Sequence, residues 1–87
     1  MRPPLTIRYF AWLREQIGVE SQSLPLPDEV RTVSGLIHYL SARDANHAAA
    51  FRNCAIIRCA VNHELADSSF PICPGDEVAF FPPITGG

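Results

Sequence analysis

The sequence predicts one α+β domain, in which a mixed sheet carries one main helix packed across one face. Its 87 residues leave room for a single core, and 47% hydrophobic with 18% charged residues is typical of a globular protein. Apolar residues alternate with period two near both ends of the chain, which indicates strands. In the middle they recur at helical spacing. These segregated patterns favour an α+β arrangement.

Residues 5–10 predict the first strand. Residues 11–17 follow as a short helical turn that Gly18 ends, because glycine readily adopts the left-handed C-cap conformation. Residues 19–26 contain prolines, which permit an edge strand but not a central one. We expect the two strands to form a hairpin with a short loop between them. In the first strand the expected core residues are Leu5, Ile7 and Tyr9, and those expected to face away are Thr6, Arg8 and Phe10.

The main helix is predicted over residues 33–43, with Thr32 as its N-cap. Gly35 lies inside it at a cost of about 1 kcal/mol relative to alanine, for which we expect close backbone packing as the reason. Residues 44–53 are predicted as a connecting segment with a second helical turn. The apolar stripe of the helix consists of Val33, Leu36, Ile37 and Leu40.

A further strand is predicted over residues 55–61, followed by a tight turn at Asn62 and His63 into residues 64–66. A stronger turn signal, Pro74-Gly75-Asp76, precedes the last strand at residues 77–81. The third strand is expected to point Ile57, Cys59 and Val61 inward and Arg58 outward. A hairpin, a helix and a last strand that returns beside the first make the β-grasp, or ubiquitin-like, topology. Residues 1–81 form this domain.

Composition argues against two classes of partner. The net charge is −2, all seven basic residues are arginines, and no basic run is present, so we expect no nucleic-acid binding. No apolar run approaches the roughly 18 residues of a membrane span, and the N-terminal residues do not resemble a signal peptide. We therefore expect a cytoplasmic protein that binds no membrane.

Cysteine and histidine give no pattern of a metal or catalytic site. The cysteines are odd in number and lack paired short spacing, so we expect reduced, partly buried thiols, with a redox role for Cys73 as the alternative. No resident active site, bound metal or permanently bound cofactor is predicted. The residues concerned are Cys54, Cys59 and Cys73, and His38, His47 and His63.

The last six residues predict an extended tail. Pro82 and Pro83 lack backbone donors, so the sheet ends at Phe81. Residues 82–87 span about 20 Å when extended, and the terminal Gly86-Gly87 fits a narrow partner tunnel. The alternative is a frayed terminus.

Strand parity predicts an exposed patch at the root of this tail. With Val78 and Phe80 inward, Phe81 points to the opposite face, which is also the expected face of Phe10. Leu65 extends the patch and Arg14 supplies a charged rim. A clustered patch beside a tail indicates a docking surface. Burial under a loop of the same chain is the alternative.

The closing run Gly75-Asp76-Glu77-Val78-Ala79-Phe80-Phe81-Pro82-Pro83, with Gly86-Gly87 at the end, resembles the small, sulfur-carrying subunits of molybdopterin synthase. This is the MoaD family of ubiquitin-like sulfur carriers. Val61-Asn62-His63-Glu64-Leu65 and the residues from Tyr9 to Glu15 continue the resemblance, which covers essentially the whole chain. Residues 44–53 are the least similar.

The resemblance implies a β-grasp fold and a reactive Gly87, with Gly86 beside it. An adenylating enzyme related to ubiquitin-activating enzymes, using ATP and magnesium, would make an acyl-adenylate. A desulfurase or rhodanese-type sulfur donor would convert it to a thiocarboxylate. The large synthase subunit would then use the sulfur to modify a pterin precursor, in an assembly of two small and two large subunits. The implied partner-binding residues are Phe10, Arg14, Leu65, Phe81, Pro82, Pro83, Ile84 and Thr85.

Two other functions remain open from the sequence. One is a sulfur carrier for thiamine synthesis or tRNA thiolation, since a terminal Gly-Gly is common to such carriers. The other is a ubiquitin-like modifier that attaches to lysines of other proteins through Gly87.

Overall fold

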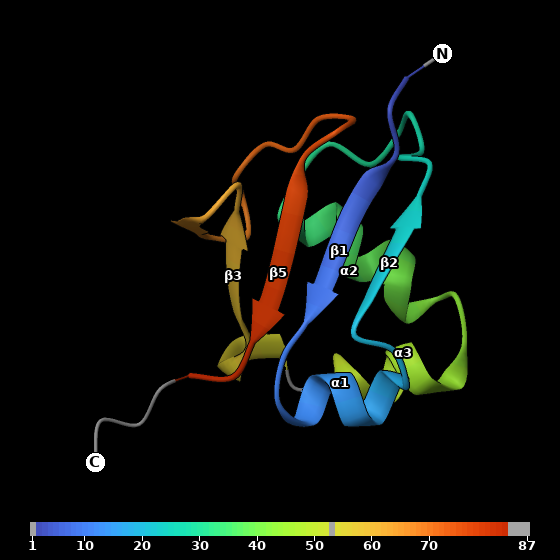
Figure 1. Ribbon diagram of the computed structural model, residues 1–87, viewed down its shortest axis with the longest axis vertical. Helices are drawn as coiled ribbons and strands as arrows, with labels where there is room; N and C mark the ends of the chain where they lie inside the picture. Colours follow the sequence, from blue (N-terminus) through green and yellow to red (C-terminus); the bar gives the residue numbers. More distant parts are fainter. Residues whose placement is uncertain (1, 53, 84–87) are drawn as a thin grey trace.

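The computed structural model describes residues 2–52 and 54–83, and it confirms the α+β architecture. Five strands form one mixed sheet in the order β2-β1-β5-β3-β4, and α2 lies behind it (Figure 1). The strands are β1 (Leu5–Tyr9), β2 (Ser21–Leu24), β3 (Arg58–Val61), β4 (Glu64–Ala66) and β5 (Glu77–Phe81). In this described part, none of the helices combines the length and apolar character needed to cross a bilayer.

Strand β5 is the centre of the sheet. It runs parallel to β1 and antiparallel to β3, so the last strand does return beside the first. Its inward residues Val78 and Phe80 are fully buried, and their partners on β1 are Ile7 and Tyr9. The alternation predicted for both strands is therefore confirmed.

The connection between β1 and β2 contains the helical turn predicted for residues 11–17, and it is therefore longer than the short hairpin loop that was also expected. The two strands pair antiparallel, but helix α1 (Trp12–Ile17) fills the connection. Leu13 and Ile17 bury their side chains in the core, which accounts for the helix at this point. Gly18, with φ of 96°, ends α1, and its N–H donates to the carbonyl of Arg14 over 2.8 Å. The predicted glycine cap is confirmed.

Helix α2 (Val33–Ser41) begins as predicted, with the Thr32 hydroxyl accepting from the Gly35 N–H over 3.1 Å. It ends two residues before the predicted boundary. Asp44 takes an extended conformation and caps a new helix, α3 (Ala45–Ala50), by accepting from the His47 N–H. The second helical turn is confirmed, and its cap explains why α2 stops early.

The proposed reason for Gly35 is wrong. A Cβ added there would lie 3.6 Å from Thr32 Oγ1 and 3.7 Å from Val30 Cγ1, which are ordinary van der Waals contacts. Nothing in the surrounding packing requires a glycine at this position.

Strand β3 starts at Arg58, three residues later than predicted. A 3₁₀ turn, η1 (Cys54–Ile56), takes up the preceding residues and leaves Ile56 exposed. Ile57 lies between this turn and the strand and is only half-buried, whereas Cys59 and Val61 are buried as expected. The turn to β4 is confirmed, with positive φ at both Asn62 (50°) and His63 (72°).

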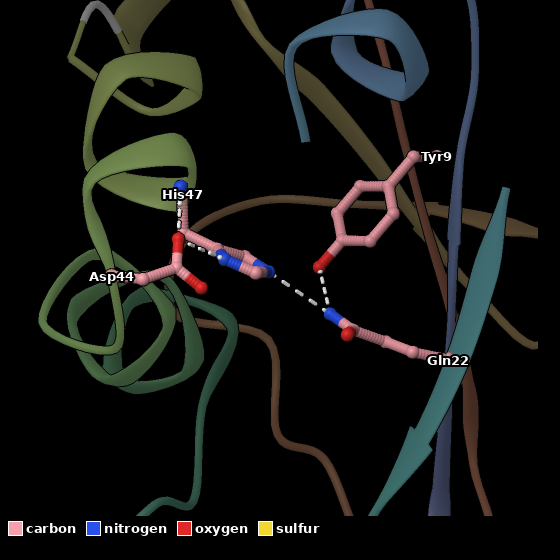
Figure 2. A network of polar contacts seen from close by, with 4 residues as sticks. All are labelled: Tyr9, Gln22, Asp44 and His47. Carbon is pink, nitrogen blue, oxygen red and sulfur yellow. Dashed lines mark hydrogen bonds and ion pairs between the residues drawn. The ribbon is translucent and has the colours of Figure 1, made fainter. Parts of the chain in front are cut away.

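A partly buried polar network joins α3 to the sheet, and sequence reasoning missed it (Figure 2). His47, which had no expected role, is only 5% exposed. Its Nδ1 lies 2.9 Å from Asp44 Oδ1 and its Nε2 lies 3.1 Å from Gln22 Nε2. Gln22 also donates to the hydroxyl of Tyr9. These contacts satisfy polar groups that burial would otherwise leave unpaired at a high cost.

Candidate functional site

The candidate site lies at the end of β5, on the sheet face that α2 leaves open (Figure 1). Phe81 is the last residue of the strand, and Pro82 and Pro83 follow it outside any strand. Prolines cannot donate to a ladder, so the end of β5 falls where their positions predict. Helix α1 lies at this same end of the sheet.

Phe81 and Leu65 come together here. Because Val78 and Phe80 face the core, Phe81 faces the open side, where it is half-buried. Leu65, on the edge strand β4, is 77% exposed. Both side chains line a hollow of about 440 Å³, together with Arg58, Cys59, Ala66 and Asp67.

Phe10 is not among the residues that line this hollow. Its N–H donates to the carbonyl of Phe80 over 3.1 Å, which fixes it next to the end of β5. The side chain is 41% exposed, and the guanidinium carbon of Arg8 lies 5.5 Å from its ring centroid. With Phe10 and Leu65 both exposed, no described loop of the chain buries this patch.

Two arginines join the predicted partner-binding residues, among which Arg14 was the one arginine. Arg14, the expected rim, is exposed on α1. Arg8 and Arg58 were not predicted as site residues, although strand parity placed both on the outward face. Arg8 pairs with Glu77 at 3.7 Å. The contact face is hereafter Arg8, Phe10, Arg58, Leu65 and Phe81.

The predicted reactive end lies outside the described residues. This applies to Ile84, Thr85, Gly86 and Gly87. Pro82 and Pro83 are described, and both are half-buried.

The described residues hold no group of three His, Cys, Asp or Glu side chains placed to bind a metal ion. A larger hollow of about 600 Å³ lies between α2 and the β3–β4 hairpin, and Arg58 and Cys59 are among the residues that line it. Burial raises the pKa of Cys59 to about 12, which suppresses the nucleophilic thiolate. Cys73 is exposed, so the expected partial burial of this thiol is wrong. It lies in a tight turn that points its side chain away from the core.

Comparisons with known proteins agree with this geometry. The model of the ThiS family matches residues 7–87. The chain is 34% identical over 83 residues to the molybdopterin synthase sulfur carrier subunit of Escherichia coli (strain K12). That alignment covers 95% of this chain and 99% of the relative.

Solved structures share the fold. The putative molybdopterin converting factor, subunit 1, of Pyrococcus furiosus is 27% identical, with a TM-score of 0.76 over 94% of this chain and 99% of that one. A complex of subunits 1 and 2 of the molybdopterin-converting factor of Helicobacter pylori matches at 20% identity. Its TM-score is 0.64 over 97% of this chain and 99% of the matched chain, a likeness of fold.

Proposed function

We propose that this chain, which belongs to the ThiS family, is the sulfur-carrier subunit of molybdopterin synthase. The observation that carries the proposal is the 34% identity to a named carrier subunit over nearly the full length of both chains. The open contact face at the end of β5 supports it, because it lies where the tail begins.

The reactive group is the carboxylate of Gly87. A terminal carboxylate has a pKa of about 3.3–3.7, so at neutral pH it is ionised and resists nucleophilic attack. An adenylating enzyme, using ATP and magnesium, activates it as an acyl-adenylate. A desulfurase or rhodanese-type donor then presents a persulfide, whose outer sulfur displaces AMP and forms an acyl disulfide. A thiol reductant cleaves that S–S bond, which leaves the thiocarboxylate on Gly87 and a disulfide between the reductant and the donor cysteine. The carrier itself holds no cofactor permanently.

The large synthase subunit provides the catalytic side chains for the transfer to the pterin precursor. The Helicobacter pylori protein of the same fold was solved as a complex of subunits 1 and 2, which supports a heteromeric assembly. Phe81 and Leu65 anchor the contact, with Arg14 at its rim, while residues 82–87 enter the partner. The assembled enzyme contains two small and two large subunits, in the cytoplasm. The free thiols of Cys59 and Cys73 suit that compartment.

Intact-protein mass spectrometry tests the carrier chemistry. The chain is incubated with the adenylating enzyme, ATP, magnesium and a sulfur donor. Replacement of one oxygen by sulfur adds about 16 Da, and fragmentation must place it at Gly87 rather than at an oxidised Met1 or cysteine. A control chain with one residue added after Gly87 is expected to fold normally and remain unmodified. Sulfur on that control would contradict a reactive terminus.

A second step separates this function from the other carriers. The thiocarboxylated chain and the large subunit are mixed with the pterin precursor, and we expect its conversion to molybdopterin. Failure of a competent pair to thiolate the precursor would instead indicate thiamine or tRNA thiolation. Lysine-linked adducts in extracts, lost when Gly86 and Gly87 are deleted, would indicate a modifier.

A further inference from the structure

We propose that the guanidinium of Arg58 binds a carboxylate of the large synthase subunit, at the edge of the hollow that Leu65 and Phe81 line. This inference rests on the proposed function. It adds a charged specificity contact beside the apolar anchors Phe81 and Leu65.

The sheet places Arg58 at the root of the tail. It is the first residue of β3 and the direct Cα partner of Phe81, the last residue of β5. Residues directly opposite each other on antiparallel strands have Cβ atoms about 4.5–5.5 Å apart and share one face. Arg58 is exposed and lines the hollow together with Phe81 and Leu65. A cation therefore stands beside the aromatic anchor.

Among the described residues, the charge of Arg58 has no ion-pair partner within 4.0 Å. Arg8, the other arginine of the contact face, is paired with Glu77 and lies against the Phe10 ring. Asp67 lines the same hollow, but its Oδ1 accepts from the Ser69 N–H over 3.0 Å and the Ser69 hydroxyl over 2.8 Å. These hydrogen bonds engage Asp67 in its own turn. Arg58 remains available to a partner.

Covering this face makes a matching anion necessary. Transferring a charged group from water into an interface without an opposite charge has a large free-energy cost. Interfaces therefore pair the cations that they bury with anions. Arginine presents a planar fork of donors that fits a carboxylate in a bidentate manner. The proposed function makes the large subunit the partner that covers this face while the tail donates its sulfur.

The position of Arg58 also favours a protein carboxylate over a substrate phosphate. Six residues, 82–87, separate Phe81 from the reactive carboxylate. Extended into a partner tunnel, they span about 20 Å, so the nucleotide and pterin chemistry takes place that far from the end of β5. At Arg58 the chain meets the partner's surface near the tunnel entrance.

The test measures the affinity of the full chain for the large subunit by isothermal titration calorimetry. Arg58→Glu is expected to weaken binding by about tenfold or more, because it sets two carboxylates against each other. Arg58→Gln is expected to reduce both the affinity and its sensitivity to salt, since a screened ion pair has been removed. The matched control is Arg43→Glu, an equal charge change at an exposed residue between α2 and α3. Its affinity should stay within about twofold of wild type.

Charge-reversal rescue identifies the partner group. Replacing the matching Asp or Glu of the large subunit with arginine is expected to restore binding of Arg58→Glu, whereas other acidic positions should not. Circular dichroism checks that each variant is folded. If Arg58→Glu does not fold, the affinity of Arg58→Gln decides the test.

Two outcomes overturn the inference while leaving the proposed function intact. One is wild-type affinity of the Arg58 variants for the large subunit. The other is a loss confined to the adenylating enzyme. A wild-type chain that binds no large subunit and accepts no sulfur at Gly87 would overturn both proposals.

Discussion

The amide nitrogen of Gln22 lies 2.6 Å from the hydroxyl oxygen of Tyr9, a contact that ties the edge strand β2 to the buried side of β1 (Figure 2). The same nitrogen lies 3.1 Å from Nε2 of His47. One amide group has two hydrogens to donate, so both neighbours act as acceptors here. His47 then carries its proton on Nδ1 and donates to Asp44, which links α3 to the sheet.

We predict that Tyr9 ionises well above the usual range of tyrosine. Burial, only partly offset by the hydrogen bond from Gln22, raises its pKa to about 12 from 10.0. A raised folded-state pKa stabilises the fold fully below pH 10, and the contribution, about 2–3 kcal/mol, is lost as the pH rises towards 12. Absorbance titration in a Tyr39→Phe background reports Tyr9 alone. Ionisation of Tyr9 near pH 10 in the folded protein would refute the prediction.

Phe81→Ala is predicted to weaken binding to the large subunit by about 1–3 kcal/mol, as for a central aromatic anchor. The side chain is half-buried in the hollow that Leu65 completes, so truncation removes apolar contact without emptying the core. Calorimetry compares it with Tyr39→Ala, which truncates an exposed aromatic on α2, behind the sheet. Equal affinities for the two variants would exclude Phe81 from the interface.

Gly35→Ala is predicted to stabilise the protein by about 0.5–1 kcal/mol, since alanine is the better helix former and its Cβ meets only ordinary contacts. Urea denaturation measures the change. Gly75→Ala is the contrasting variant. Gly75 has φ of 89°, and an added Cβ would lie 3.0 Å from Pro3 Cγ, so we expect a loss of at least about 1 kcal/mol. A destabilising Gly35→Ala would reveal a constraint that the packing does not show.

Cys73 is predicted to react with iodoacetamide at pH 8 far faster than Cys59. Cys73 is exposed, whereas Cys59 is buried, and that burial raises the pKa of the Cys59 thiol to about 12. Peptide mass spectrometry of a Cys54→Ser variant follows the two thiols separately. In urea the two rates should converge. Equal rates in the folded protein would contradict the burial of Cys59.

Much of the fold was predictable because its signals are local. Alternation identified the inward residues of β1 and β5, the hydroxyl of Thr32 and the freedom of Gly18 marked helix ends, and paired prolines ended β5. Parity also placed Phe10 and Phe81 outward before any pairing was known. The predicted start of the strand at residues 55–61 was wrong, because a 3₁₀ turn and a short apolar strand have similar sequence patterns.

The sequence alone was sufficient to predict the inward side chains of β1 and β5 and the end of the last strand at Phe81. Those features depend on neighbours in the chain. Only the tertiary structure decided that Arg58 stands opposite Phe81, that Leu65 shares its hollow, and that His47 reaches Gln22. These relationships join segments far apart in sequence. They depend on strand register and helix packing, which set the distances between elements. Neither segment of such a pair carries a local sequence pattern that reveals its partner.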